Sequence, residues 1–385
     1  MTLSGASSYT GSTTIDGGVL KFTSTGSIYA NDITTNLYVN SGAVLDVYNW
    51  GWYGSLGGLR FDQANLVING GTVRYSGLTG GDWRSFTVGS LGATFDNPNS
   101  GVTWSLNNSA QAPVISGNLT FTGAGNTVNN HTLTGSGYSV IKNGTGTLTL
   151  GGTNTYTGGT NINAGTLQVN SSAALSSSGT ISMGGGVLQY TSNNTTDYSS
   201  RFSTAAGQAY YVDTNSQNVT WATALISSGA TLTKQGAGTL TLSGANTYAG
   251  GSNINAGALL VNSSGALGSA GTLNFGGGTL QYSASNTTDY SARFSTAAGQ
   301  AYKVDTNGQN VTWATALTSS GATLNKAGSG TLTLSGANTY SGGATVSAGT
   351  LKIGVASVGS VGAMTSGALG TADAIVLSGG AIDLN

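Results

Sequence analysis

The feature that most constrains this chain is a tandem repeat with a period of 92 residues. The pentapeptide Gly-Thr-Leu-Thr-Leu, which begins at Gly146, returns at Gly238 and again at Gly330. Residues 146–237 and 238–329 match at most positions, so they are a near-exact duplication. A period of this length indicates one supersecondary architecture used several times, and not several unrelated domains.

The repeat divides the chain into four segments. Residues 330–385 form a partial copy after the two complete ones, and residues 1–145 form a diverged first copy. The diverged copy carries an insertion at about 23–68 that has no counterpart in the later copies. We therefore expect 1–145, 146–237, 238–329 and 330–385 to build one continuous solenoid.

The composition favours strands and tight turns over helices. The chain has 64 glycines and no glutamate, and only 6% of its residues are charged, against about 25% in an ordinary globular protein. Threonine, serine and asparagine fill the polar positions, and these residues disfavour helix interiors. Short alternating segments such as 239–242 and 258–261 are separated by turns of glycine, serine and asparagine. The sequence predicts an all-β fold.

The spacing of the apolar residues favours a parallel β-helix. Apolar positions recur at intervals of roughly 17–23 residues, which suits one coil of a solenoid. Strands this short cannot bury a face alone, but coils stacked ~4.8 Å apart place their inward Leu, Val, Ile and Phe in one column. We therefore predict an elongated single rod, a β-solenoid. An antiparallel sandwich is the competing all-β fold, yet it should show Asn-Gly hairpin turns in place of the tandem Gly-Gly and Ala-Gly turns found here.

Charge and cysteine content exclude several functional classes. A net charge of -1 offers no basic patch for nucleic acid. The absence of cysteine excludes a disulfide framework and a thiol nucleophile. No apolar run approaches the roughly 18 residues of a membrane-spanning helix, and no signal peptide follows Met1. If the protein is exported, we expect its signal outside this sequence.

The repeated segment resembles a known family. Residues 238–257 read Gly-Thr-Leu-Thr-Leu-Ser-Gly-Ala-Asn-Thr-Tyr, followed by Gly-Gly and Ile-Asn-Ala-Gly, and 146–169 and 339–352 read similarly. This pattern resembles the autotransporter-associated β-strand repeat, also called the passenger-associated transport repeat. The resemblance implies a right-handed β-helix in a large exported bacterial protein, carried to the surface by a translocator that we expect outside this sequence.

The two ends of the chain match repeat strands. Residues 2–9 align with 241–248, and residues 379–384 resemble 185–190. Solenoids normally close with atypical coils that cover the last strand edge. We therefore expect either a segment of a longer chain or a subunit whose ends stack head-to-tail.

Residues able to carry catalysis are few. His131 is the single histidine, in a polar strand-like stretch, and we expect it to face solvent or a turn. Metal sites built from His and Cys clusters are excluded by count. We expect no catalytic residue, no metal and no cofactor, and hence no enzyme.

Aspartate–arginine pairs are the closest approach to a polysaccharide-cleaving site. Asp82 stands beside Arg84, and two further pairs recur with the 92-residue period: Asp197 with Arg201, and Asp289 with Arg293. A catalytic centre seldom occurs several times in one stalk. We therefore expect these residues to be structural, either as ion pairs or as aspartate caps on turn amides.

Aromatic residues are better candidates for binding. Trp221 and Trp313 recur in Val-Thr-Trp, and we expect them in aromatic ladders inside or along the solenoid. One stretch of six residues inside the insertion contains four aromatic residues that have no counterpart in the later copies: Tyr48, Trp50, Trp52 and Tyr53. They predict a sugar-stacking or protein-contact patch; the alternative is a small local core that holds the insertion down.

Together these features predict an extracellular structural or adhesive β-solenoid of a large bacterial surface protein. It would act as a rigid stalk or a self-stacking filament module, with itself or with host or cell-surface glycans and proteins as partners, and without inserting into a membrane. The alternative is a polysaccharide-binding or polysaccharide-degrading β-helix of the phage or secreted depolymerase kind. Ice binding is disfavoured because the Thr-x-Thr arrays recur once per 92 residues and not in every coil.

Overall fold

The chain folds into parallel strands stacked as a β-solenoid, which confirms the predicted all-β fold class. The computed structural model describes residues 1–7, 11–28, 36–49, 66–82, 85–107, 112–360, 363–371 and 374–384. Its helical elements there are two short 3-10 turns, η1 (Ser199–Arg201) and η2 (Ser291–Arg293). Among these residues no helix has the length and apolar character needed to cross a membrane. The chain divides into two compact units, an N-terminal unit (Met1–Asn194) and a C-terminal unit (Thr195–Asn385).

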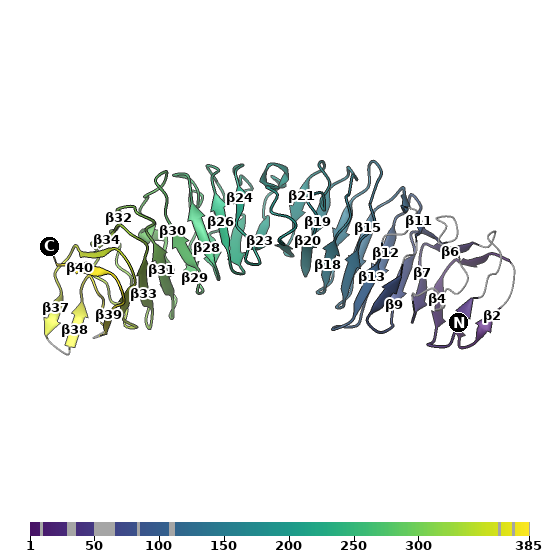
Figure 1. Cartoon of the computed structure of the whole chain (residues 1–385), viewed down its shortest axis with the longest axis horizontal. Helices are drawn as coiled ribbons and strands as arrows, with labels where there is room; N and C mark the ends of the chain where they lie inside the picture. Colours follow the sequence, from purple (N-terminus) through teal and green to yellow (C-terminus); the bar gives the residue numbers. More distant parts are fainter. Residues whose placement is uncertain are drawn as a thin grey trace. The chain divides into compact units, whose positions relative to one another are not determined.

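The N-terminal unit contains three parallel sheets and one short strand pair (Figure 1). The first sheet runs β1 (Thr2–Leu3), β4 (Gly18–Phe22), β7 (Ala43–Val47), β9 (Thr72–Tyr75), β12 (Ala93–Asp96), β15 (Leu119–Thr122), β17 (Val140–Lys142), β19 (Thr160–Ile162) and β21 (Ile181–Met183). The second runs β10 (Gly80–Asp82), β13 (Thr103–Leu106), β16 (Asn126–Asn129), β18 (Thr147–Leu150), β20 (Thr166–Val169) and β22 (Val187–Gln189). The third runs β3 (Thr13–Ile15), β6 (Leu37–Asn40), β8 (Leu66–Asn69), β11 (Thr87–Val88) and β14 (Val114–Ile115), and β2 (Ala6–Ser7) pairs with β5 (Ser27–Ile28).

The strands of the C-terminal unit lie in three parallel sheets and one antiparallel hairpin. Its first runs β23 (Ala209–Asp213), β25 (Thr231–Gln235), β27 (Ser252–Ile254) and β29 (Leu273–Phe275). Its second runs β24 (Val219–Trp221), β26 (Thr239–Leu242), β28 (Ala258–Val261), β30 (Thr279–Gln281), β31 (Ala301–Asp305), β33 (Thr323–Ala327), β35 (Ala344–Val346) and β39 (Ile375–Leu377). Its third runs β32 (Val311–Trp313), β34 (Thr331–Leu334), β36 (Thr350–Ile353) and β40 (Ala381–Asp383), and β37 (Val358–Ser360) forms an antiparallel hairpin with β38 (Ala363–Ser366).

Alternation along each strand separates core from surface. In β18, Leu148 and Leu150 are fully buried, while Thr147 and Thr149 face outward and are partly exposed. Leu148 pairs in register with Leu167 of β20, which in turn pairs with Leu188 of β22. The inward leucines therefore form a column across successive coils, and this column is the core.

Strands that are equivalent by the 92-residue repeat occupy different sheets of the C-terminal unit. β25 and β27 lie in its first sheet, whereas their equivalents β33 and β35 lie in its second. β26 and β28 lie in the second sheet, and their equivalents β34 and β36 in the third. The shift arises because β31 pairs directly with β30. The sheet that contains β26, β28 and β30 therefore continues with β31, β33 and β35, which are the equivalents of β23, β25 and β27 in the first sheet. One sheet ends and another begins in each copy.

Candidate functional site

The predicted aromatic patch lies mostly outside the described residues. Three of its four members lie outside the described residues: Trp50, Trp52 and Tyr53. The fourth, Tyr48, is half-buried just after β7. Close by, Tyr75 stacks on Trp104 with 5.2 Å between ring centroids. Burial, with a smaller contribution from Tyr48, raises the pKa of Tyr75 above its ordinary value. Binding by the four aromatics stays a prediction.

The repeated aspartates cap backbone amides at the start of new sheets. Asp289 accepts hydrogen bonds from the amides of Ser291 in η2 and Ala314 just after β32, each at 2.8 Å. Asp197 makes the two equivalent contacts one repeat earlier, beside η1 and β24, also at 2.8 Å. Each aspartate thus ties the 3-10 turn to the strand that begins a sheet, where the outer strand edge needs cover. Of the third predicted pair, Arg84 and the Asp82 side chain lie outside the described residues.

The arginine of η2 binds the loop that precedes β29. The Arg293 guanidinium donates to the carbonyls of Leu267, Gly268, Ala270 and Gly271, at 2.5–3.1 Å. Burial lowers the pKa of Arg293 below its ordinary value. Arg201 occupies the equivalent position in η1. Asp289 and Arg293 therefore act on backbone groups on either side of the turn.

The two repeated tryptophans lie in the core. Trp313 is fully buried, its indole N–H donates to the Tyr282 hydroxyl at 3.0 Å, and Phe294 meets it edge-on at 4.8 Å. Trp221 is 1% exposed and meets Phe202 in the same way, also at 4.8 Å. Each indole packs against the phenylalanine that follows the 3-10 turn. Because both indoles are buried, neither presents a face for sugar stacking.

The expectation that His131 faces solvent or a turn is wrong. Its side chain is fully buried, and the ring stands edge-on to Phe86 with 5.5 Å between centroids. The inward alternation of β16 continues past the end of the strand, so Asn129, His131 and Leu133 all point into the core. The surrounding polar residues concealed this register in the sequence.

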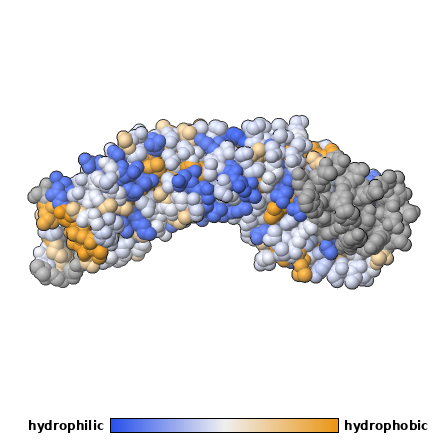
Figure 2. Space-filling view, in the orientation of Figure 1, coloured by the Kyte–Doolittle hydropathy of each residue, from blue (hydrophilic) through white to orange (hydrophobic). Residues whose placement is uncertain are grey.

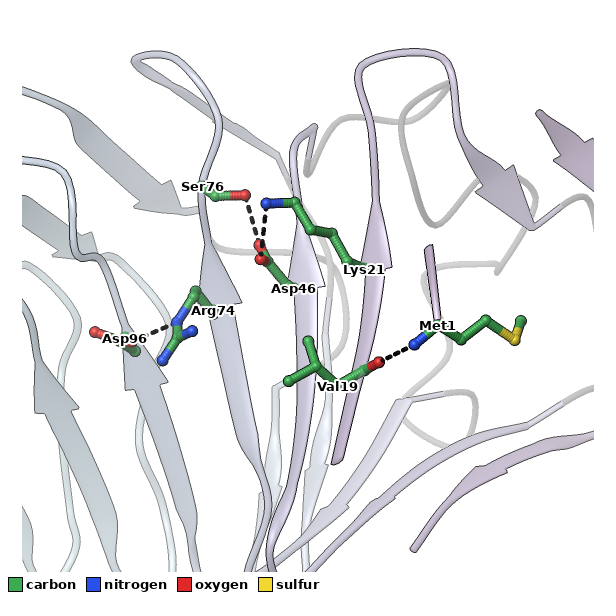
Figure 3. A network of polar contacts seen from close by, with 7 residues as sticks. All are labelled: Met1, Val19, Lys21, Asp46, Arg74, Ser76 and Asp96. Atoms are coloured by element: carbon green, nitrogen blue, oxygen red, sulfur yellow. Dashed lines mark hydrogen bonds and ion pairs between the residues drawn. The ribbon is translucent and has the colours of Figure 1, made fainter. Parts of the chain in front are cut away.

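Four charged residues form a row along the first sheet of the N-terminal unit. Lys21, Asp46, Arg74 and Asp96 stand in register on consecutive strands, with alternating sign. Lys21 Nζ lies 3.5 Å from Asp46 Oδ2, and Arg74 Nε lies 2.8 Å from Asp96 Oδ2 (Figure 3). The Ser76 hydroxyl donates to Asp46 Oδ1 at 2.5 Å. We call these four residues the charge row; their irregular spacing along the chain hid it from sequence analysis.

Three lysines with the 92-residue period were also missed by sequence analysis. Lys142, Lys234 and Lys326 are 0–2% exposed, although lysine is seldom buried. Each stands at an inward position; Lys234, for example, pairs in register with Val212 and Ile254. Their regular spacing and their place in apolar alternation were the available signals.

The ammonium group of each lysine binds three backbone carbonyls at a corner of the coil. Lys234 Nζ donates to Gln235 and Gly236 at 3.0 and 2.7 Å, and to Ala256 of the next coil at 3.1 Å. Lys142 and Lys326 make the same three contacts at 2.7–3.1 Å. We call this arrangement the lysine clamp. It joins two successive coils through a buried charge.

Burial sets the protonation behaviour of the clamps. Desolvation lowers the pKa of Lys142, Lys234 and Lys326 to about 8. Asp213 partly offsets this effect at Lys234, and Asp305 does so at Lys326. Since the three carbonyl acceptors favour the charged form, the clamps are predominantly protonated at neutral pH.

The polar groups described above hold neighbouring coils together. Over the described ranges, no group of three or more His, Cys, Asp or Glu is placed to hold a metal ion. The caps, clamps and charge row all join residues of neighbouring coils.

Comparison with known proteins finds a family whose model matches segments of the repeat. The model of the passenger-associated transport repeat matches residues 1–22, 140–169, 232–261 and 324–353, and the last three segments each contain one lysine clamp. A curated relative, the adhesin BmaC autotransporter of Brucella suis biovar 1 (strain 1330), is 32% identical over 155 residues. That match covers 40% of this chain and 3% of the relative, so the chain spans a small part of that protein's length. No solved structure matches the chain.

Proposed function

We propose that the chain is a stalk segment of an exported adhesin of the autotransporter-passenger type, which the match of four of its segments to the passenger-associated transport repeat supports. Its action is geometric: stacked coils hold other parts of a surface protein away from the cell. The observation that carries this proposal is the use of polar groups. The repeated aspartates, the charge row and the lysine clamps all serve contacts between coils.

The adhesive part of the proposal rests on likeness to a protein named as an adhesin. Many weak contacts along a repeated surface would add avidity without any single strong site. The partners would be glycans or proteins of host or bacterial surfaces, and the chain would act outside the cell, without binding nucleic acid or entering a membrane. We propose no enzymatic activity; release of reducing sugars from a panel of bacterial polysaccharides would overturn this.

Small-angle scattering of the purified chain tests the stalk. We expect an elongated particle, and deletion of the complete copy 238–329 should shorten its maximum dimension by roughly 20 Å, since four or five coils of ~4.8 Å are lost. Residue 330 is equivalent to residue 238 in the repeat, so after the deletion residue 237 is still followed by the start of a copy. The strands on both sides of the deletion can therefore pair as they do in the full chain. A compact particle, or an unchanged maximum dimension in the deletion variant, would reject the stalk.

Adhesion is tested separately with beads that carry the chain. Beads coated with the wild-type chain should adhere to bacterial or host cells, and beads coated with the 238–329 deletion should adhere less because avidity falls with repeat number. Equal adhesion of bare and coated beads would remove the adhesive role.

Self-association is a second candidate function, favoured by an exposed apolar area. Five large apolar side chains there are 41–76% exposed: Val358, Ile375, Val376, Leu377 and Leu384. Figure 2 shows this area in orange over the C-terminal strands. Sedimentation velocity over a range of concentrations should reveal oligomers that Val376→Thr weakens. A monomer at all concentrations would dismiss self-association.

A further inference from the structure

We propose that a corner of the last three transport repeats is a binding cage for a monovalent cation of the ammonium class, and that the ammonium group of the buried lysine occupies this cage. The inference stands independently of the stalk and adhesin roles. It rests on the bonding of the lysine ammonium groups themselves, whereas the stalk proposal uses only the fact that the clamps join neighbouring coils.

The cage is the same in three copies. Two of its oxygens come from the turn that follows the lysine, and the third comes from the corner of the next coil. An ammonium group has three N–H donors, and each cage offers three carbonyl acceptors at 2.7–3.1 Å. Donor and acceptor numbers therefore match, as a dedicated site requires.

Glycine forms one wall of the cage. Gly257 adopts φ +61°, and a Cβ built there would lie 2.8 Å from Lys234 Nζ. Gly165 and Gly349 show the same conformation and the same approach to Lys142 and Lys326. The Ala-Gly that recurs at this place in the three clamp-containing copies thus keeps the cage open to a cation.

Carbonyl dipoles are the common source of attraction. Asp213 faces Lys234 from β23 and Asp305 faces Lys326 from β31, whereas Lys142 keeps the same cage with no such aspartate acting on its pKa. Three neutral oxygens suit a monovalent ion, since calcium takes six to eight oxygen ligands that include carboxylates. The chain therefore carries its own cation, and stacking at these corners should not depend on cations in the medium.

Chemical rescue of Lys234→Ala in the full chain tests this proposal. The substitution removes three methylenes and the ammonium, which n-propylammonium replaces. Amide exchange at 231–235 and 252–258 should accelerate about tenfold or more, because three buried acceptors lose their donor. We expect n-propylammonium chloride to restore protection, while sodium chloride at equal ionic strength and 1-propanol do not.

A matched control separates the cage from an ordinary lysine. Lys303 Nζ donates to a single carbonyl, that of Gly277 at 2.9 Å, so Lys303→Ala should change exchange little and show no rescue. Equal rescue by 1-propanol would mean that the lysine only fills space, and would overturn the proposal.

A second variant covers the case in which Lys234→Ala fails to fold. Lys234→Met keeps an apolar stem and removes the charge. We expect faster exchange at the same amides, with protection recovered in ammonium chloride but not in sodium chloride. Wild-type protection of Lys234→Met in sodium chloride alone would equally overturn the cage.

Discussion

The first coils and the duplicated coils join their outward faces by different means. In the N-terminal unit, the charge row places opposite charges on successive strands. In the C-terminal unit, the equivalent surface carries uncharged rows: Asn253 Nδ2 donates to Thr233 Oγ1 at 3.0 Å, and Asn274 Nδ2 donates to Asn253 Oδ1 at 2.9 Å. The charge row thus joins coils of unlike sequence by ion pairs, and this row of the duplicated coils joins its strands by uncharged side-chain hydrogen bonds.

This difference shows how each region specifies which coil follows which. Alternating charges favour one order, because like charges directly opposite each other are destabilising. A ladder of similar amides pairs equally well with several neighbours. In the duplicated coils the register must therefore be set elsewhere, and the lysine clamps and aspartate caps provide fixed contacts between defined coils.

The largest effect should come from the core, where the two regions are alike. Trp104→Ala and Trp313→Ala each remove a fully buried indole, so each should lower the free energy of unfolding by about 3–5 kcal/mol. Hydrogen exchange in the coils around each site measures the loss. Ile226→Ala, at a side chain 53% exposed, is the control and should stay within about 0.5 kcal/mol. A large loss in one region alone would show that the cores are not equivalent.

Alkaline pH should affect the stability of the chain through the three lysine clamps. Between the folded pKa of about 8 and the ordinary value of 10.5, the unfolded chain binds more protons at Lys142, Lys234 and Lys326. Stability should therefore rise from pH 8 towards pH 10, by about 1–3 kcal/mol per lysine. Above pH 10 it should fall, because burial raises the pKa of Tyr248 and Tyr282 and the folded chain then holds the extra protons.

Thermal unfolding across pH 7–11 checks this profile. Lys234→Met should reduce the rise between pH 8 and 10 by about one third, because Lys142 and Lys326 remain, and should leave the fall above pH 10 unchanged. A melting temperature that declines steadily from pH 8 would contradict the assignment.

The charge row should make a smaller and salt-sensitive contribution. Arg74→Met breaks the 2.8 Å contact with Asp96 and should cost about 1 kcal/mol in low salt, since Arg74 is partly exposed. A double-mutant cycle with Asp96→Asn isolates the pair, and 1 M salt should shrink the coupling. Coupling that persists undiminished in high salt would argue against an electrostatic origin.

The amide rows should show the smallest effect. Asn253→Ala removes two ladder contacts on a partly exposed face, so we expect a loss of about 0.5 kcal/mol with no salt dependence. Hydrogen exchange at β25, β27 and β29 in low and high salt measures it. A loss as large and as salt-sensitive as that of Arg74→Met would erase the distinction between the two regions.

The sequence predicted which segments form strands better than it predicted which side chains are buried outside them. Segments 239–242 and 258–261 were predicted as strands, and they are β26 and β28. The resemblance of 238–257 to the transport repeat was also confirmed by the family match at 232–261. By contrast, His131 was assigned to a solvent-facing or turn position and lies in the core, because its polar neighbours gave no sign that alternation continues past β16.

The sequence by itself determined the alternation, the period of 92 residues and therefore the solenoid, because inward and outward positions are properties of consecutive residues. Only the tertiary structure decided which coils meet. It placed β27 and β35 in different sheets although they are equivalent in the repeat, and it brought Lys21, Asp46, Arg74 and Asp96 into one row. The physical reason is that pairing between coils depends on the length and path of every turn between them, and a lysine becomes a clamp only when the next coil's carbonyl arrives at its ammonium group.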